Sequence, residues 1–564
     1  MIFYVKFISF EVKPGYRSDH SILELSFSVS KFKRGKGTWK LNTSFLKEKE
    51  FVDLVKKCIK EEYKNYAIPV YSPQFLNNLN KEIQLKIDYD LFLEVILLRI
   101  RGEAIKYGSK KKILRSKNEN KLILEIQQLE ECNGTIDIDK LEKKKKDLIE
   151  LRQNELQGNL IRSRTQWNIE GEKPTKYFCA LEHRNYIDKT IKCFKRPDGT
   201  YTKNQEEILQ EIRNFYAKLF APQDTELQKF DFSKLLKGQK VEKLCQKEAL
   251  SIEGHLTIKE LSEALKNTKN NKTPGLDGFP AEFFKVFWKT LKYCVTKAIN
   301  TSFDKGIMPL SLRQCVITSL PKNGKSREDI ANWRPLSMLS VVYKLCSSAI
   351  ANRIKPLLNK IIDKTQCGFV KGRYIGECTR IVYDIMSYTE NFNIPGMLVL
   401  IDFQKAFDSI SWNFTYKTLS FLGFTENFLK WIILFNTEIK AMILQSGYLS
   451  DPIDIGRGCR QGDPISAYLF ILAAQILTLL IKGNNDVKGI LIDTLEFKIS
   501  HFADDTTLIL DGTIKSLEHA LNILEVFGSI SGLRVNTDKT QIVWIGKKSV
   551  VKRKLFVTNT PEKL

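Results

Sequence analysis

The stretch HFADDTTLIL (residues 501–510) places two adjacent carboxylates between apolar and β-branched neighbours. Such neighbours favour strands, so we expect a β-hairpin with Asp504 and Asp505 at its turn. Two like charges this close repel each other unless water or a cation compensates them. The pair therefore predicts either a solvated turn or a metal site, and the rest of the sequence has to decide between them.

A second acidic segment is MLVLIDFQKAFDSISW (397–412). Its apolar run predicts a buried strand with Asp402 at the C-terminal end, and we expect Asp408 to cap the helix that follows. Carboxylates that meet at neighbouring strand ends supply the hard oxygen ligands that Mg²⁺ prefers. Two such ions can activate a 3′-hydroxyl and stabilise the leaving oxygen in phosphoryl transfer. Asp402, Asp504 and Asp505 are therefore a candidate two-metal site.

The composition restricts the class of protein. A chain of 564 residues exceeds one ordinary core, and 43% hydrophobic with 11% aromatic residues excludes a disordered protein. The formal net charge of +24 indicates a polyanionic partner, either nucleic acid or an anionic membrane. The 11 cysteines occur without any C-x-x-C pair, which favours a reducing intracellular compartment over a zinc site or a disulfide framework.

Two apolar segments could be mistaken for membrane signals. PISAYLFILAAQILTLLIK (464–482) is nearly long enough to span a bilayer, but it contains Ser466 and Gln475 and follows a charged, Gly-rich turn. We therefore expect a buried helix and no membrane association. The N-terminal MIFYVKFISFEVK is interrupted by Lys6 and Glu11, which favours a strand over a signal peptide. We therefore expect an intracellular protein, located in either the nucleus or the cytoplasm.

The chain changes character along its length. Residues 1–40 suggest strands, whereas 41–270 are mostly helical and basic, with a long amphipathic helix around EKKKKD (142–147). This lysine run is either a solvated helix face or a surface that contacts phosphates. RPDGTYT (196–202) predicts a hairpin turn, and a Gly/Pro-rich break follows at 270–280. Helices and strands alternate from there on, so the fold class is α+β.

Five segments occur in the order and spacing of known polymerase motifs. They are LIDFQKAFDSISW (400–412), HFADD (501–505), GRGCRQGDPISAYLFILAAQIL (456–477), ITSLPKNGKSREDIANWRPLSMLSVVYKLCSSAIANRI (317–354) and LRVNTDKTQIVWIG (533–546). Residues 260–546 thus resemble the reverse transcriptases of non-LTR retrotransposons, the long-interspersed-element class, here within a truncated polyprotein.

The resemblance implies a right-hand polymerase fold, α+β, with fingers, an antiparallel palm sheet with helices, and a mostly helical basic extension before them. The expected domains are an endonuclease/exonuclease/phosphatase-like remnant (1–40), the extension (41–270), fingers with part of the palm (271–400), and the palm with its catalytic motifs (401–564). The thumb is expected to be absent or incomplete.

The resemblance also implies an activity, namely RNA-directed DNA polymerisation with two Mg²⁺ ions, or Mn²⁺ in their place. Template RNA, primer DNA and dNTPs would be its partners. Asp402 and Asp504, followed by Asp505 and the carbonyl of Phe403, match the metal ligands. Lys539 matches a general acid that protonates the departing pyrophosphate.

Further residues match the nucleotide site of that family. Phe407 would exclude a ribose 2′-hydroxyl by steric clash, and Gln461 with Gly462 would pack against the incoming nucleotide. Lys322 and Arg334 would neutralise the triphosphate. QCGFVKGR (366–373) resembles a segment near template and primer, to which we assign Gly368, Phe369 and Arg373.

The N-terminal RSDHSILELSFSV (17–29) resembles the last motif of an apurinic-like endonuclease, with Asp19 and His20 as its catalytic pair. The rest of that fold would lie upstream, so we expect a vestige without nuclease activity. Three other readings are open. They are an inactive nucleic-acid-binding remnant lacking thumb and endonuclease, an RNA-directed RNA polymerase, and a group II intron maturase. Phe407 and the A-x-D-D form argue against the second, and the endonuclease-like start argues against the third.

Overall fold

The computed structural model describes residues 6–13, 22–28, 35–68, 83–131, 138–163, 190–223, 227, 230–232, 236 and 241–546. Asp19, His20 and the segment 171–185 lie outside these residues. The expected strands near the N-terminus are present, since β1 (Lys6–Lys13) pairs antiparallel with β2 (Ile22–Ser28). The assignment of these strands to an endonuclease remnant stays a prediction, as do the domain boundaries.

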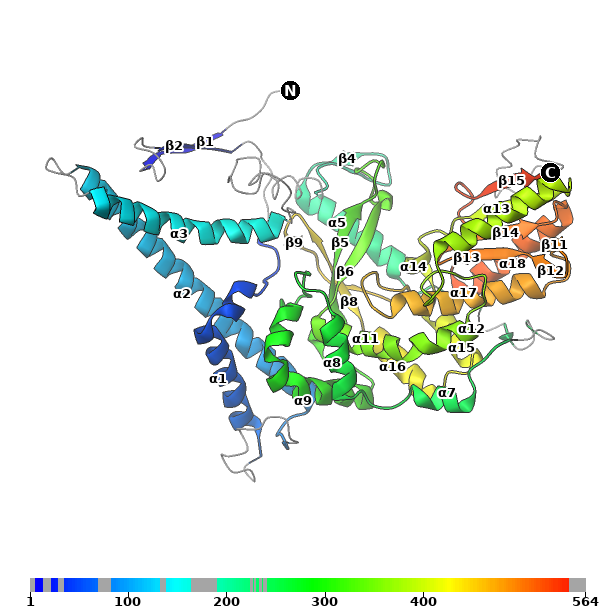
Figure 1. Cartoon of the computed structure of the whole chain (residues 1–564), viewed down its shortest axis with the longest axis horizontal. Helices are drawn as coiled ribbons and strands as arrows, with labels where there is room; N and C mark the ends of the chain where they lie inside the picture. Colours follow the sequence, from blue (N-terminus) through cyan, green and yellow to red (C-terminus); the bar gives the residue numbers. More distant parts are fainter. Residues whose placement is uncertain are drawn as a thin grey trace.

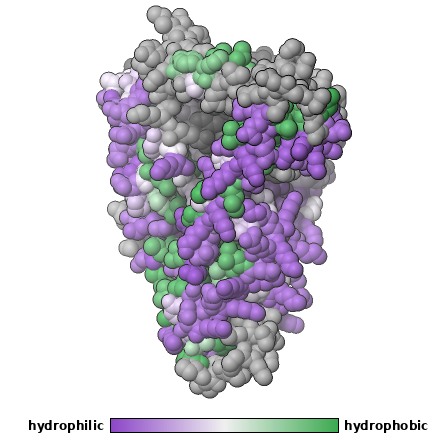
Figure 2. Space-filling model, turned by 90° about the vertical axis from the view of Figure 1, so that its left-hand side faces the viewer, coloured by the Kyte–Doolittle hydropathy of each residue, from purple (hydrophilic) through white to green (hydrophobic). Residues whose placement is uncertain are grey.

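A long helical hairpin dominates the N-terminal part (Figure 1). It consists of α2 (Tyr89–Glu131) and α3 (Ile138–Ser163), and α1 (Lys49–Tyr66) packs beside the base of α2. Hydrophilic side chains cover much of this side of the molecule, with apolar ones between them (Figure 2). α3 confirms the predicted long helix around the lysine run.

The side chains of the lysine run point in two directions. Lys144 and Lys145 turn toward α2 and form ion pairs of 2.7 Å with Glu125 and Glu130. Only their two flanking lysines are exposed. Because residues three or four apart share a helix face, four consecutive lysines cannot all point outward when the helix packs against a partner.

A mixed five-stranded sheet lies in the middle of the chain. Its order is β10-β8-β5-β6, with β9 paired to β8, and β5 runs parallel to β8. The strands are β5 (Gln314–Pro321), β6 (Trp333–Met338), β8 (Lys440–Gln445), β9 (Tyr448–Leu449) and β10 (Ile453–Asp454). Next to it, β3 (Phe194–Lys195) and β4 (Tyr201–Thr202) form the hairpin that RPDGTYT predicted.

A second sheet carries the acidic motifs. It is entirely antiparallel, in the order β13-β14-β7-β15. Its strands are β7 (Gly396–Ile401), β13 (Ile499–Phe502), β14 (Asp505–Leu510) and β15 (Gln541–Ile545). A separate hairpin, β11 (Ile490–Ile492) with β12 (Leu495–Phe497), lies close to its edge.

Helices cover both faces of this four-stranded sheet, which explains why β7 is apolar throughout. Met397 and Val399 belong to the main core, whereas Leu398 packs with Ile385 of α13 (Ile375–Asn391) in a smaller cluster on the other face. Successive strand side chains point to opposite faces, so both faces of β7 are buried as far as Val399, whereas Leu400, next to the acidic end, is 39% exposed. α17 (Ser466–Gly483) and α18 (Ile514–Ser531) pack on the main-core side.

The remaining helices pack around the two sheets and against the base of α2. They are α5 (Gln205–Phe220), α7 (Gln246–Ser251), α8 (Ile258–Asn267), α9 (Ala281–Lys305), α10 (Leu310–Arg313), α11 (Val341–Ile354), α12 (Leu358–Ile361), α14 (Ala406–Ser409), α15 (Trp412–Phe421) and α16 (Glu426–Asn436).

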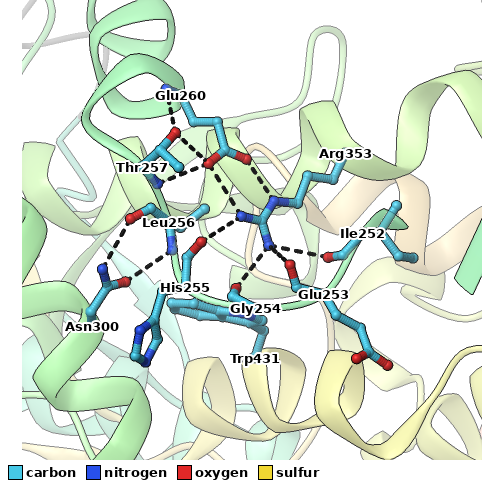
Figure 3. Close-up of polar contacts among 10 residues, drawn as sticks. All are labelled: Ile252, Glu253, Gly254, His255, Leu256, Thr257, Glu260, Asn300, Arg353 and Trp431. Atoms are coloured by element: carbon cyan, nitrogen blue, oxygen red, sulfur yellow. Dashed lines mark hydrogen bonds and ion pairs between the residues drawn. The ribbon is translucent and has the colours of Figure 1, made fainter. Parts of the chain in front are cut away.

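One arginine ties several of these helices together (Figure 3). Arg353, near the end of α11, donates to both carboxylate oxygens of Glu260, at 2.6 and 3.2 Å. It also donates to four successive backbone carbonyls, those of residues 252–255, at 2.8–3.1 Å. Trp431 of α16 donates to the Gly254 carbonyl at 3.2 Å. A guanidinium satisfies this turn because its five donors fan out in one plane.

α17 is the apolar helix that could be mistaken for a membrane span. Of all helices in the described ranges, it alone is long and apolar enough to cross a bilayer, and 78% of that stretch is buried inside the protein. The predicted buried helix is therefore confirmed. Its N-terminus follows directly on the turn 459–465, which lies next to the acidic motifs.

Candidate active site

The three predicted carboxylates meet at one end of the four-stranded sheet. Asp402 follows the last residue of β7, and Asp504 lies in the two-residue turn between β13 and β14. Thr506 pairs with Ile401 in the sheet, so Asp505, the first residue of β14, stands beside the position of Asp402. The predicted hairpin and strand end are both confirmed as secondary structure.

The charge of these carboxylates is only partly compensated. Burial raises the pKa of Asp504, and the neighbouring charges of Asp505 and Asp402 raise it further. One oxygen of Asp402 accepts hydrogen bonds from Asn536 at 2.9 Å and Lys539 at 3.1 Å. Within the described ranges, no group of three or more Asp, Glu, His or Cys side chains is arranged to hold a metal ion. A cation shared by the carboxylates would therefore have to displace part of the Asp402 pairing.

Basic side chains face the carboxylates from the other sheet. Lys322 directly follows β5, and Arg334 lies on β6 opposite Leu320. Burial lowers the pKa of Lys322, the positive charges of Lys539 and Arg334 lower it further, and the charge of Asp402 opposes them. Lys322 is thus coupled electrostatically to Asp402, and Arg334 is coupled to Asp504. The site can therefore accommodate an anion and a cation side by side.

An aromatic stack fixes Phe407, which follows Asp402 by five residues. The Phe407 ring stacks on Phe470 of α17, with centroids 4.3 Å apart and an interplanar angle of 21°. The edge of a second ring, that of Phe369, approaches it at 6.4 Å and 89°. Packing of this kind restricts the rotamers of Phe407. A rigid ring at this position can discriminate between ligands by shape.

The turn that contains Gln461 and Gly462 contacts both β6 and α14. The Ser337 amide of β6 donates to the Gln461 carbonyl at 2.9 Å, and the Cys459 amide donates to the Phe407 carbonyl at 2.6 Å. Gly462 has φ +111°, and a Cβ there would lie 2.8 Å from the Ser337 carbonyl oxygen. Only glycine fits this approach. The turn is thus bonded both to β6 of the mixed sheet and to α14, the helix that follows Asp402.

Comparison with known proteins now becomes informative. Residues 320–555 match the family model described as reverse transcriptase (RNA-dependent DNA polymerase). The matched segment holds all three carboxylates, the facing basic pair and the Gln461 turn. This chain contains a reverse transcriptase domain.

Relatives of the chain come from retrotransposable elements. A protein of transposon TX1 from Xenopus laevis is 28% identical over 93% of this chain and 38% of its own length. In Drosophila melanogaster, the Pol polyprotein of the type-2 element R2DM is 27% identical over 49% of this chain and 25% of its own length. The RNA-directed DNA polymerase of the mobile element jockey is 23% identical over 50% of this chain and 31% of its own length. The reverse transcriptase domain is therefore similar to those of retrotransposable elements, and the chain spans well under half the length of these curated relatives.

Two of the predicted residues have contacts that sequence analysis did not foresee. Phe403 forms an isolated antiparallel bridge with Val535. The hydrogen bonds of this bridge involve the Asp402 carbonyl and the Gln404 amide, and none of them uses a backbone group of Phe403. Arg373 donates to the carbonyls of Ile362, Asp363 and Gln366, at 2.5–3.0 Å. Metal ligation by Phe403 and contact of Arg373 with template or primer stay predictions.

Asp408 does not cap a helix, which corrects our expectation. It lies inside α14 and is 6% exposed, whereas Lys405, with φ +48°, precedes that helix and Ser411 caps α15. Burial raises the pKa of Asp408 to about 7, although Lys405 and Lys322 oppose the shift. After the tight turn at Lys405, α14 already begins at Ala406, before the position that the sequence pattern indicates. Asp408 therefore lies inside this helix and is buried.

Sequence analysis missed other residues that shape the reverse transcriptase domain. Asn536, Gln366 and Phe470 contact Asp402, the Ala503 backbone and Phe407, respectively. Their positions in the D region, in QCGFVKGR and in the apolar helix gave only weak signals. An amide or aromatic residue acquires such a role through contacts distant in sequence.

Proposed function

We propose that the reverse transcriptase domain is an active RNA-directed DNA polymerase, which adds dNTPs to a primer 3′-hydroxyl on an RNA template. The observation that carries the proposal is the meeting of Asp402 with the Asp504–Asp505 hairpin inside a domain of this family. Carboxylates facing basic side chains suit the transfer of a polyanionic phosphoryl group. We also infer that the retrotransposable element encoding this chain uses the activity to copy its own RNA.

The donor set fits Mg²⁺ or Mn²⁺ in kind. Carboxylate oxygens are hard ligands. Burial, and after it the charges of Asp505 and Asp402, raise the pKa of Asp504, and a cation would compensate this negative charge. Asp402 and Asp504 would hold the metal, with Asp505 and the Phe403 carbonyl completing its surroundings. When bound, a pair of such ions supplies Lewis-acid activation of the hydroxyl and charge stabilisation of the leaving group.

The remaining site residues have roles of their own in this proposal. Lys322 and Arg334 bind the triphosphate and orient it toward the primer, since Lys322, directly after β5, is coupled electrostatically to Asp402, and Arg334, on β6, to Asp504. Lys539 holds the proton that the departing pyrophosphate takes up. Phe407, fixed by its stack on Phe470, excludes a 2′-hydroxyl and so selects dNTPs over rNTPs.

We further propose that the four-stranded sheet is the palm and the β5–β6 pair belongs to the fingers. This agrees with the carboxylates on the former and the basic pair on the latter. The α2–α3 hairpin would belong to a basic extension that contacts template RNA. Its exposed lysines, among them Lys143 and Lys146, support this role, because phosphate contacts are the main source of non-specific RNA affinity.

Primer extension on a poly(rA) template with an oligo(dT) primer and Mg²⁺ tests the proposal. Asp402→Asn and Asp504→Asn should lower dTMP incorporation by about 10³-fold or more, because each removes a metal ligand charge. Asp511→Asn is the matched control. It lies just beyond the other end of β14, and an asparagine can still accept the bond from the Thr513 amide.

Three outcomes would contradict the proposal or part of it. Incorporation that survives Asp504→Asn would refute the metal-site assignment. Tight template–primer binding by the wild-type chain without any extension would favour the inactive nucleic-acid-binding remnant. Incorporation of UMP as efficient as that of dTMP would refute the steric role of Phe407 and favour an RNA polymerase.

A further inference from the structure

The turn that carries Asp504 has an unusual backbone. It contains only Ala503 and Asp504, since Phe502 pairs with Asp505 across the hairpin. Ala503 has φ +60°, in the left-handed region that residues with a Cβ seldom adopt. Tight hairpin turns with a positive φ at their first residue normally have glycine there. Something outside the hairpin must therefore hold Ala503 in this conformation.

The side chain of Gln366 is bonded to both polar groups of the Ala503 backbone. Its Oε1 accepts from the Ala503 amide at 2.9 Å, and its Nε2 donates to the Ala503 carbonyl at 3.1 Å. Oε1 also accepts from the Gly368 amide at 2.8 Å. Gln366 is only 2% exposed, so water does not compete for these bonds. The carboxamide of Gln366 thus satisfies both backbone polar groups of Ala503, as a neighbouring strand does for a residue within a sheet.

The backbone around Gln366 is itself attached to the hairpin. The His501 amide donates to the Thr365 carbonyl at 2.8 Å, and the Cys367 amide donates to the His501 carbonyl at 2.9 Å. A Cβ on Gly368 would lie 2.4 Å from the Ala503 amide nitrogen, so only glycine allows this approach. The segment 365–368 therefore acts as a short additional strand along β13.

The guanidinium of Arg373 fixes this segment from behind. It donates to the Gln366 carbonyl at 2.7 Å and to the carbonyls of Asp363 and Ile362 at 2.5 and 3.0 Å. Gln366 consequently cannot move away from the hairpin without breaking several bonds at once. The carboxylate of Asp504 is one residue beyond the atoms that Gln366 holds.

We propose that Gln366 is a positioning residue, which imposes the left-handed conformation on Ala503 and thereby directs the Asp504 carboxylate toward Asp402. Gly368 and Arg373 act with it by seating its backbone against the hairpin. The proposal rests on the proposed polymerase function for its effect on catalysis. Its effect on the conformation of the turn and on cation binding can be measured separately.

Two substitutions in the full chain remove the bonds in different ways. Gln366→Met keeps the length of the side chain but makes no hydrogen bonds to Ala503. Gln366→Glu keeps the acceptor but loses the donor to the Ala503 carbonyl. Gln445→Met is the matched control, because Gln445 is also buried, at 4% exposure, but lies on β8 of the other sheet.

Three measurements follow on each variant. They are hydrogen–deuterium exchange of peptides covering residues 499–508, Mn²⁺ binding by electron paramagnetic resonance without nucleotide, and the Mg²⁺ concentration for half-maximal primer extension. Both Gln366 variants should exchange faster in this hairpin and bind Mn²⁺ about 10-fold more weakly, as is typical when the support of a metal ligand is removed. Gln445→Met should change neither quantity.

The second-site substitution Ala503→Gly provides the decisive comparison. Glycine adopts φ +60° without support, so Ala503→Gly should restore Mn²⁺ binding in the Gln366→Met background at least in part. Hairpin exchange and Mn²⁺ affinity within twofold of the wild type in both Gln366 variants would refute the proposal. Global unfolding of both variants that Ala503→Gly does not rescue would also refute it, since Gln366 would then be a general structural residue.

The proposed polymerase function can fail independently. If the wild-type chain extends no primer while the Gln366 variants still loosen the hairpin and weaken Mn²⁺ binding, the positioning role stands and only the activity is refuted.

Discussion

The Nζ atom of Lys539 lies 3.1 Å from Oδ2 of Asp402, and Asn536 donates to the same oxygen at 2.9 Å. The backbone amide of Asn536 also donates to the Asp402 carbonyl at 2.7 Å. The turn that contains Asn536 and Lys539 thus holds both the backbone and the side chain of Asp402. The proposed proton donor thus neutralises a proposed metal ligand. Binding of a cation would compete with this ion pair and release Lys539 toward the nucleotide.

Lys539→Met should therefore have opposite effects on cation binding and on catalysis. Mn²⁺ should bind the nucleotide-free protein about 2- to 5-fold more tightly, since a half-exposed ion pair contributes less than about 1 kcal/mol. Incorporation of dNTP under saturating Mg²⁺ should fall by about 10²-fold because a general acid is lost. Electron paramagnetic resonance and single-turnover extension measure the two quantities.

Lys515→Met, at an exposed position near the start of α18, is the control for loss of a positive charge. A change of both quantities in the same direction would show that Lys539 serves only to hold Asp402 in place.

Selection of the sugar should depend on Phe470 as well as on Phe407. Phe407→Val should raise the ratio of rNTP to dNTP incorporation by about 10- to 200-fold, the range typical for contacts of this size. Phe470→Leu removes the ring stacked 4.3 Å below Phe407 and should raise the ratio by about 2- to 10-fold. Competitive incorporation of UTP and dTTP measures both.

Phe392→Leu removes another aromatic pair, with Tyr388 at 4.6 Å, away from the site and should leave the ratio unchanged. If Phe470→Leu had no effect while Phe407→Val did, the stack would be ordinary core packing.

The sequence predicted those parts of the site that local patterns determine. The apolar run before Asp402 and the flanks of Asp504 fold as the expected strands, because burial on one or both faces dictates their composition. Register within the sheet then brings Asp505 beside Asp402.

Features that depend on tertiary packing could not be predicted. Gln366 reaches Ala503 and Lys539 reaches Asp402 across gaps of 137 residues each, and no periodic pattern encodes such pairs. The division of the lysine run of α3 could not be predicted for a similar reason, since the ion pairs of Lys144 and Lys145 with Glu125 and Glu130 require the hairpin partner. Asp408 was assigned as a cap because Asp is common at that position, but the turn geometry places it in the core.

A buried network should hold the turn that carries Gln461. Asp463 accepts from Tyr343 at 2.6 Å and also from Ser347, both on α11, and from Arg460 at 3.3 Å. Asp463→Ala should lower the free energy of unfolding by about 3–5 kcal/mol, because it leaves Arg460 buried without its partner. Urea denaturation measures the loss. Any folded fraction should show a raised KM for dNTP, because the Gln461 turn loosens.

Asp454→Ala is the comparison, since Asp454 is 86% exposed and its pairing with Lys440 is 3.9 Å long. It should cost less than about 1 kcal/mol. Equal losses for the two variants would mean that the network contributes no more than a surface ion pair.

The stability of the domain should depend on pH through Asp408. Its pKa rises from 3.8 to about 7 on folding, so the folded state holds this proton between those values and the unfolded state does not. The contribution of Asp408 to stability is therefore fully present below pH 3.8 and is lost as the pH rises to about 7. An asparagine at this position does not titrate, so Asp408→Asn removes the dependence.

Relative to the wild type, Asp408→Asn should gain about 2 kcal/mol in unfolding free energy between roughly pH 5 and pH 8, and no more above that. The gain stays below the full value of the pKa shift because Lys405, whose own pKa burial lowers to about 8, loses its negative neighbour. Urea denaturation of both proteins across this pH range measures it. Asp451→Asn, at an exposed position, should run parallel to the wild type. A parallel curve for Asp408→Asn would mean that Asp408 stays ionised in the core, held by Lys405 and Lys322.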